Sequence, residues 1–174
     1  MNDAHHNAPL KKAGGAMFVL AWLLLLGMLA VYFSADEERR NNPNAIPETL
    51  DIDGKRTLVL QANRQNHFIA AGEINGSKVT LLLDTGATNV AIPADMQRKL
   101  GLQRGMEGVA YTANGRVKTY STTIDRLQIG EIVLRNVAAD LNPGMNGSDA
   151  ILLGMSALSQ VHFTQRDGKL LIAQ

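Results

Sequence analysis

The sequence predicts an all-β, barrel-like domain with one or two short helices, preceded by one transmembrane helix. Three observations support this fold class: residues 13–33 carry no charge, many short apolar runs with regular turns follow, and only one or two stretches have the caps of a helix. With 174 residues and 45% hydrophobic content, the chain has room for one domain of ordinary size plus an appendage.

The composition excludes several classes of protein. The net charge is +1 and no cluster of lysine or arginine is long enough to follow a phosphate backbone, so we expect no nucleic-acid partner. The absence of cysteine excludes a disulfide framework and a thiolate metal site, and leaves the compartment open. His5 and His6 lie in a polar tail, and because a metal site needs three or four convergent ligands, we expect no metal there.

The N-terminal region predicts a short tail, residues 1–12, and a membrane-spanning signal anchor, residues 13–33. About 20 apolar residues in a helix cross the hydrocarbon core of a bilayer. Trp22, Tyr32 and Phe33 supply aromatic side chains, the last two near the outer interface.

A cleaved signal peptide is the alternative, with Lys11 and Lys12 as its basic region. The apolar run is longer than usual for such a peptide, and residues 33–35 make a poor cleavage site, so we prefer the uncleaved anchor. Lys11 and Lys12 are matched by Arg39 and Arg40 on the other flank, so the charge rule only mildly favours a cytoplasmic N-terminus.

Residues 34–57 predict a flexible linker. They contain Pro43 and Pro47, are rich in polar residues and show little hydrophobic periodicity. A linker of this kind holds the folded domain, residues 58–174, near the membrane while allowing it to reorient, and it is a candidate processing site.

The first part of the folded region predicts a β-hairpin around Asn75-Gly76, whose return strand ends in the apolar run 81–83. Asp84 follows directly, and an ionised carboxylate at the end of a buried strand is costly unless its oxygens are hydrogen-bonded or its proton is shared. Asp84 is therefore strained or functional.

The turn that Asp84 opens has small residues throughout, namely Asp84, Thr85, Gly86, Ala87 and Thr88. Gly86 has no Cβ, so backbone N–H groups and a second chain can approach the carboxylate closely. The two threonines add short hydroxyl groups that can brace the turn.

Further along the chain, residues 93–101 predict a short helix that packs Met96 and Leu100 inward. Residues 108–120 predict two strands around a second Asn-Gly turn, and by themselves indicate an ordinary surface hairpin. Four more segments complete the domain: a hairpin over 124–137, a loop over 142–149, an apolar run over 151–155 followed by the helix-like 156–159, and a hairpin over 161–172. His162 lies in the last hairpin and is expected to be structural.

Three features together resemble a known family: the 84–88 motif after an apolar strand, the Leu-Leu-Gly-Met segment at 152–155, and the hairpin between them. They are similar to the retropepsin-like (clan AA) aspartic proteases, specifically the bacterial membrane-anchored branch, over residues 58–174. The resemblance implies the closed barrel of the acid-protease fold, with the two motifs side by side beneath the active site. It also implies a single-pass protein of the bacterial inner membrane with its C-terminal domain in the periplasm.

The same resemblance implies roles for individual residues. Asp84 is the one catalytic aspartate of each protomer, the 85–88 turn supports it, and Leu153 and Gly154 lie beneath it. The hairpin over 108–120 corresponds to the flap that folds over bound peptide. Its assigned residues are Tyr111, as a wall of the substrate groove, and Ala113, Asn114 and Gly115 near the tip.

An aspartic protease needs two carboxylates that share a proton, one to activate a water molecule and one to donate to the scissile carbonyl oxygen. The chain has one Asp-Thr-Gly, and neither Asp53-Gly54 nor Asp167-Gly168 has buried runs around it. We therefore expect a homodimer that brings two copies of Asp84 together. The mechanism requires a peptide substrate, no metal and no organic cofactor, and predicts better activity in mild acid.

Two other functions fit the same residues. One is a catalytically inactive retropepsin-like module that dimerises or binds peptides while tethered to the membrane. The other is an unrelated β-barrel in which Asp84 only caps a turn.

Overall fold

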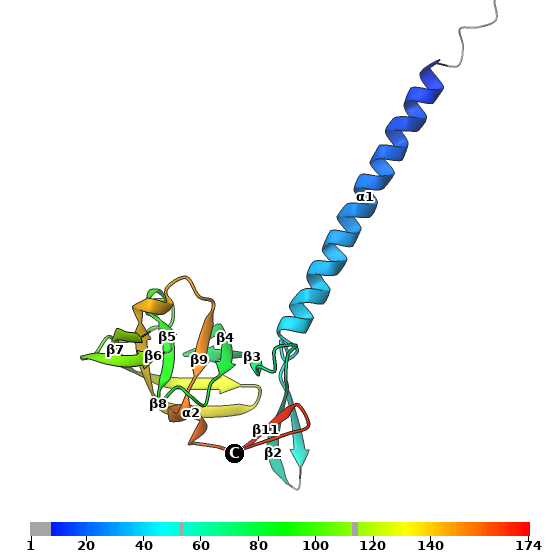
Figure 1. Cartoon of the computed structure of the whole chain (residues 1–174). Helices are drawn as coiled ribbons and strands as arrows, with labels where there is room; N and C mark the ends of the chain where they lie inside the picture. The colour runs from blue at the N-terminus through cyan, green and yellow to red at the C-terminus, as the bar shows by residue number, and fades with distance from the viewer. Residues whose placement is uncertain (1–7, 53, 113–114) are drawn as a thin grey trace, which may run out of the picture. The chain divides into compact units, whose positions relative to one another are not determined.

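One long helix and two β-sheets make up the structure, a computed structural model that describes residues 8–52, 54–112 and 115–174 (Figure 1). The chain divides into two units, one that ends at Arg40 and one that runs from Asn41 to Gln174.

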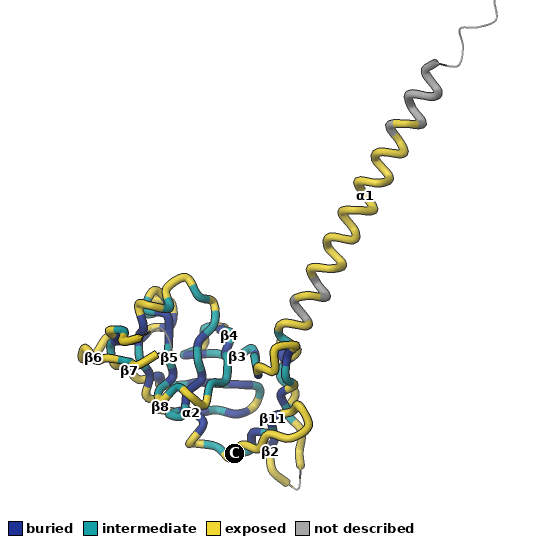
Figure 2. The backbone as a smooth tube through the Cα atoms, viewed as in Figure 1, coloured by how far each residue is buried: buried dark blue, intermediate teal, exposed yellow. Residues whose placement is uncertain are grey.

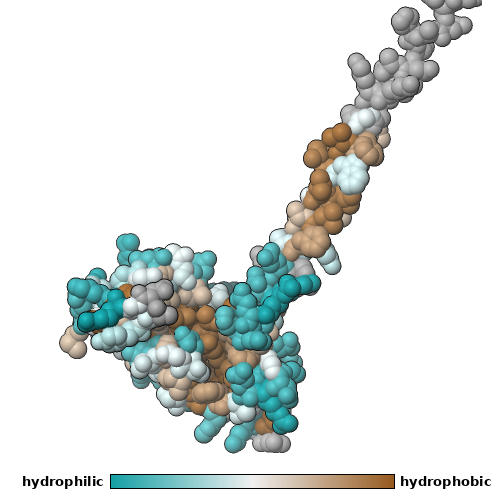
Figure 3. Space-filling view, in the orientation of Figure 1, coloured by the Kyte–Doolittle hydropathy of each residue, from teal (hydrophilic) through white to brown (hydrophobic). Residues whose placement is uncertain are grey.

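Helix α1, Ala8–Asn41, is the first unit's main feature. Its apolar side chains are exposed along the segment Met17–Ser34, which has a mean hydropathy of 2.3 and no buried residue (Figures 2 and 3). A segment of this length and composition is apolar enough to cross a membrane or to serve as a signal sequence. The sequence predicts the membrane span to end at Phe33. The helix itself continues through the polar residues up to Asn41.

The second unit is mostly β, as predicted. The larger sheet has the order β3-β4-β9-β5-β8-β7-β6, and a further pairing of β3 with β7 closes it into a barrel. The smaller sheet has the order β1-β2-β11-β10. The strands are β1 Glu48–Ile52, β2 Lys55–Gln61, β3 Ile69–Ile74, β4 Ser77–Leu83, β5 Val90–Pro93, β6 Glu107–Thr112, β7 Gly115–Ile129, β8 Ile132–Asn142, β9 Ala150–Leu153, β10 His162–Arg166 and β11 Lys169–Ala173. The short helices are η1 Ala94–Met96, η2 Pro143–Met145 and α2 Met155–Leu158.

Three of the predicted hairpins form around turns that lie within the described residues. Asn75 and Gly76 have φ values of 49° and 82° between β3 and β4, and Asp167 and Gly168 have 51° and 71° between β10 and β11. Left-handed conformations at both central residues suit the twist of a two-residue hairpin, and asparagine, aspartate and glycine adopt them most easily. In the turn between β7 and β8 only the first central residue, Gly130, is left-handed, with φ of 56°.

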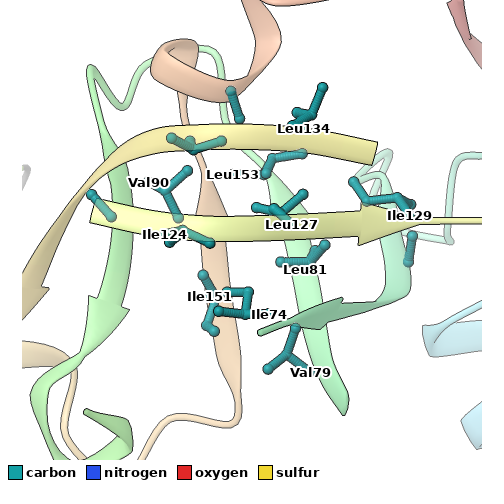
Figure 4. Close-up of a cluster of buried hydrophobic side chains, with 14 of the residues drawn as sticks. Ile74, Val79, Leu81, Val90, Ile124, Leu127, Ile129, Leu134, Ile151 and Leu153 are labelled. Carbon is teal, nitrogen blue, oxygen red and sulfur yellow. The ribbon is translucent and has the colours of Figure 1, made fainter. Parts of the chain in front are cut away.

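The core of the barrel consists of aliphatic side chains from strands that are far apart in the sequence (Figure 4). Leu81, Ile124 and Ile151 come from β4, β7 and β9, and each is fully buried. Burial of such a side chain stabilises the fold by roughly 1.5–3 kcal/mol, so this cluster holds the site's strands in register.

The prediction of a flexible linker over 34–57 is wrong for most of that range. Its first residues extend α1, and its last residues form β1 and the start of β2. Asn44 between them is only 4% exposed, and its amide group bridges the two sheets by donating to the carbonyls of Gln61 (2.9 Å) and Ile69 (2.7 Å). The Gln61 N–H donates back to Asn44 Oδ1 at 2.7 Å. The folded unit therefore begins at Asn41 and not at Leu58, because one buried polar side chain ties this segment to both sheets.

The helix predicted over 93–101 is shorter than expected. Only Ala94–Met96 forms a 3₁₀ turn, and the segment then continues as turns that end at Gly101, with φ of 65°. Leu100 is buried and Met96 packs against the core, as the apolar spacing predicts.

Candidate active site

The Asp-Thr-Gly loop crosses the end of a strand that lies beneath it. β9 lies between β4 and β5 in the sheet, with β4 parallel to it, and Leu83 is paired with Leu153 (Figure 1). The loop that joins β4 to β5 must therefore pass over the C-terminal end of β9. At the start of the loop, the Asp84 N–H donates to the Leu153 carbonyl at 3.1 Å.

Asp84 is half-buried at the point where β4 ends. Its Oδ1 accepts a hydrogen bond from the Gly86 N–H at 2.9 Å, and its carbonyl accepts one from the Ala87 N–H at 3.2 Å. A Cβ on residue 86 would lie 3.1 Å from that Oδ1, so a larger residue would crowd the carboxylate. The loop thus fixes the carboxylate's direction with its own backbone.

Gly154 is buried directly under this loop. A Cβ built on Gly154 would collide with the Asn89 carbonyl and would lie 2.7 Å from the Ala87 carbonyl oxygen. The two segments are joined by backbone hydrogen bonds, from the Met155 N–H to the Ala87 carbonyl (2.8 Å) and from the N–H of residue 156 to the Thr88 carbonyl (2.9 Å). Only glycine allows the loop backbone to approach the end of β9 this closely.

Ser156 is a support that the sequence analysis missed. Its Oγ accepts from the Val90 N–H at 3.0 Å and donates to the Ala138 carbonyl at 2.7 Å, which links β5 to β8. The signal in the sequence is weak, since a serine in the first turn of a short helix is ordinary.

A cleft of about 790 Å³ brings the loop together with the β6–β7 hairpin and the end of β8. Its wall is formed partly by the residues around the carboxylate and partly by β6. The lining residues are Asp84, Gly86, Ala87, Thr88, Asn89, Ala91, Gly108, Val109, Ala110, Tyr111, Thr112, Thr119, Asp140, Asn142 and Leu152.

The predicted site residues are distributed unevenly around this cleft. Thr85 is exposed and does not line it, whereas Leu153 and Gly154 are buried beneath the loop. Tyr111 lines the cleft and remains 80% exposed. Gly115 begins β7 outside the cleft, and the predicted tip residues at 113 and 114 lie outside the described residues.

Exposed side-chain contacts join the two strands of the β6–β7 hairpin that borders the cleft. Lys118 Nζ lies 3.0 Å from a Glu107 carboxylate oxygen, and this hydrogen bond and charge raise the pKa of Lys118. The Arg116 guanidinium lies 5.7 Å from the centre of the Tyr111 ring, which is within range of a cation–π contact. Both contacts are exposed and fix the hairpin only loosely.

A second carboxylate lines the cleft and was not identified from the sequence. Asp140 Oδ2 accepts a hydrogen bond at 2.9 Å from Nδ2 of Asn89, at the end of the Asp84 loop. Residue 140 lies between the hairpin predicted over 124–137 and the loop predicted over 142–149 and belongs to neither. The segments that carry Asn89 and Asp140 are 51 positions apart, so their contact depends on the pairing of β5 with β8.

The family model described as "gag-polyprotein putative aspartyl protease" matches residues 70–160. This range includes the Asp84 loop, the β6–β7 hairpin and the Leu-Leu-Gly-Met segment. It covers the barrel from β3 to α2.

Relatives and a solved structure agree with this match. The "Uncharacterized protein in cobV 5'region" of a Sinorhizobium species is 32% identical over 66% of this chain and 50% of its own length. An uncharacterized protein of Rickettsia prowazekii (strain Madrid E) is 28% identical over the same shares. The chain thus spans about half the length of the curated relatives it matches. The crystal structure of a retropepsin-like aspartic protease from Rickettsia conorii is 26% identical, with a TM-score of 0.57 over 73% of this chain and 94% of that chain.

These findings exclude the unrelated barrel in which Asp84 only caps a turn. The fold is retropepsin-like, and a family model matches more than half of the chain around the loop that carries Asp84. The chain belongs to the retropepsin-like aspartic protease family.

Proposed function

We propose that the chain is a membrane-anchored aspartic endopeptidase, which hydrolyses peptide bonds with a water molecule activated by two Asp84 carboxylates of a homodimer. One observation carries the proposal: Asp84 directly follows strand β4 of the barrel, its Oδ1 accepts a hydrogen bond from the Gly86 N–H at 2.9 Å, and it lines a cleft that a hairpin borders. A carboxylate oriented in a groove of this size is suited to act on a bound peptide.

The dimer follows from the chemistry. A lone carboxylate cannot serve as base and acid in the same step, and the chain contains a single Asp-Thr-Gly. Two copies of Asp84 across a two-fold axis would hold one proton between them, because two like charges at short distance do not both ionise. The ionised member takes a proton from water as it attacks the carbonyl carbon, and the protonated member donates to the carbonyl oxygen. Activity is then highest in mild acid, where the pair holds one proton.

The residues around the carboxylates position them and cover the substrate. Gly154 lets the loop lie close to β9, and the 85–88 turn keeps the Asp84 side chain directed into the cleft. The β6–β7 hairpin acts as the flap, with Tyr111 against the peptide and residues 113–115 at its tip. Closure of such a hairpin excludes water from the reacting groups.

We also propose that residues 13–33 anchor the protein in the bacterial inner membrane, with residues 1–12 in the cytoplasm and the 41–174 unit in the periplasm. The exposed apolar face of α1 supports this arrangement, as do relatives from bacteria. The chain has no cysteine, so single cysteines introduced for Asn2 and Ser159 can be labelled separately. In intact spheroplasts, a membrane-impermeant maleimide should label the second and not the first; the reverse result would contradict the orientation.

The activity is tested by comparing two soluble fragments, Asn41–Gln174 and its Asp84→Asn counterpart. The fragment begins at Asn41 because Asn44 is part of the fold. Each is incubated with a denatured protein mixture between mild acid and neutral pH, and new peptide termini are identified by mass spectrometry. We expect termini from the wild type alone, because the amide that replaces the carboxylate keeps the shape of the loop but cannot share a proton.

If no cleavage is seen, the oligomeric state of the wild-type fragment decides how this result is interpreted. If a folded, dimeric wild-type fragment produces no termini, the endopeptidase proposal is wrong and the inactive peptide-binding module takes its place. If the fragment is monomeric, the full-length chain in lipid vesicles is assayed in the same way, since the anchor raises the local concentration of the domains.

A further inference from the structure

Asp140 lines the cleft beside the end of the Asp84 loop. It belongs to β8 and is paired with Ala91 of β5, which is in turn paired with Leu152 of β9. All three line the cleft, so they form a row across neighbouring strands. Strands are spaced about 4.8 Å apart, which places Asp140 roughly 10 Å from Leu152 along the row. A peptide held at Asp84 would extend its side chains over this distance.

The Asp140 carboxylate is hydrogen-bonded to a neutral group. Its hydrogen bond comes from the neutral amide of Asn89, and it takes part in no ion pair among the described residues. The described lining of the cleft includes two carboxylates, Asp84 and Asp140, and no lysine, arginine or histidine. A bound peptide removes water from such a carboxylate, and this is costly unless the peptide supplies a cation.

The surroundings of Asp140 fit a long basic side chain. Ala91 and Leu152 offer an apolar strip beside it, and Thr119 and Asn142, which are 3% and 6% exposed, add polar groups to the lining. Lysine and arginine have an apolar stem and a charged end, so they match a strip that leads to a carboxylate. Asn89, which also lines the cleft, orients the carboxylate by donating a hydrogen bond to Oδ2.

We infer that Asp140 and Asn89 form a subsite that selects lysine or arginine in the peptide substrate. The subsite rests on the proposed endopeptidase function, since it names the substrate class of the same cleft. Asp140 acts here as a specificity residue and takes no part in bond cleavage.

The test uses the full-length chain in vesicles and two pools of random-sequence peptides. The basic pool contains lysine and arginine, and the glutamine pool has glutamine at the same positions. We expect wild-type kcat/KM to be about tenfold higher for the basic pool than for the glutamine pool, because a partly buried hydrogen bond between charged groups contributes about that much to binding. Asp140→Asn should remove this preference while retaining cleavage of the glutamine pool, because the amide oxygen still accepts from Asn89. The matched control is Asp125→Asn, which removes the same charge from an exposed position on β7 outside the cleft.

A charge reversal strengthens the test. Asp140→Lys should shift the preference toward a pool that contains glutamate. The inference is overturned if Asp140→Asn keeps the basic preference, if the wild type has none, or if Asp140→Asn abolishes cleavage of both pools while remaining folded by circular dichroism. The last result would make Asp140 part of the catalytic machinery.

Peptide-binding measurements distinguish a failure of the subsite inference from a failure of the proposed function. If the wild type cleaves neither pool, the endopeptidase proposal fails. Fluorescein-labelled versions of the two pools are then titrated against the Asp84→Asn variant and against the Asp84→Asn/Asp140→Asn double variant. Tighter binding of the basic pool that depends on Asp140 would support the subsite in a peptide-binding module. Equal affinities for the two pools would overturn it.

Discussion

At residue 154, where the Asp84 loop crosses the end of β9, only glycine fits. The loop that carries Asp84 passes over it, and the carbonyls of Asn89 and Ala87 occupy the space that a side chain would need. These carbonyls belong to backbone that is itself held by hydrogen bonds, so they cannot move aside cheaply.

Replacing Gly154 with alanine should therefore lower the free energy of unfolding by about 3 kcal/mol, as overpacking does in a close-packed interior. The measurement is urea denaturation of the Asn41–Gln174 fragment followed by far-UV circular dichroism, because the one tryptophan, Trp22, lies outside this fragment. Gly108→Ala is the matched control, since its Cβ would meet only Thr119 Oγ1, at 3.6 Å. Equal stability of the two variants would contradict this account of the crossing.

Asn44 is the second residue whose importance depends on its surroundings. Its side-chain amide group makes three hydrogen bonds that connect β2 to β3. Its backbone carbonyl also accepts a hydrogen bond from the Ala71 N–H at 3.1 Å. These three side-chain hydrogen bonds are part-buried and would be lost if the side chain were removed. A buried group that is left unsatisfied costs about 1–3 kcal/mol.

Asn44→Ala should thus destabilise the same fragment by about 3 kcal/mol in urea denaturation. Asn41→Ala serves as the control, because Asn41 is exposed and only its backbone carbonyl accepts from Asn63, at 3.2 Å. A change of less than about 0.5 kcal/mol for Asn44→Ala, the range of ordinary surface substitutions, would show that the segment does not brace the two sheets.

At the scale of elements, the β6–β7 hairpin lies beside the cleft, and the side-chain contacts between its strands, Lys118 with Glu107 and Arg116 with Tyr111, are exposed. Tyr111 is 80% exposed. Tyr120, further along β7, instead packs against the core, and the Arg104 guanidinium lies 3.2 Å from the centre of its ring. The first tyrosine is therefore available to a peptide, and the second is part of the fold.

Tyr111→Ala should raise KM for peptides about tenfold and leave the free energy of unfolding within about 0.5 kcal/mol of the wild type, since an exposed ring contributes little to stability. Steady-state kinetics on a cleaved peptide and urea denaturation check the two parts. Tyr120→Ala is the contrasting variant and should destabilise the fragment. Unchanged kinetics for Tyr111→Ala would remove this residue from the substrate groove.

At the scale of the whole molecule, the proposed mechanism needs a second copy of the chain, because each chain contains one Asp-Thr-Gly. The apolar helix α1 would keep two copies together if it is inserted in a membrane. Confinement raises the effective concentration of a tethered domain, so association becomes easier without any new contact.

The soluble Asn41–Gln174 fragment should accordingly lose specific activity on dilution below its dimer dissociation constant, while the full-length chain in vesicles keeps it. The measurement pairs activity at several concentrations with analytical ultracentrifugation of the fragment. Specific activity that stays constant where the fragment is monomeric would contradict the shared site.

The sequence by itself determined the local structure and the motif. Apolar runs and Asn-Gly or Asp-Gly turns specify the hairpins, because the turn residues readily adopt the left-handed backbone conformation that a tight turn needs. The length of the uncharged run specifies one helix long enough to cross a membrane, and the Asp84 motif with the Leu-Leu-Gly-Met segment indicates the family.

Tertiary structure alone decided the contacts between distant segments. In the sequence Asn44 is one more residue of a polar stretch, and only the positions of β2 and β3 on either side of it reveal its role. Asp140 likewise becomes part of the site only through the pairing of β8 with β5. The reason is physical: turn and strand preferences act over a few neighbouring residues, whereas a buried hydrogen bond or a cleft depends on which strands pair, and that is settled by packing of the whole barrel.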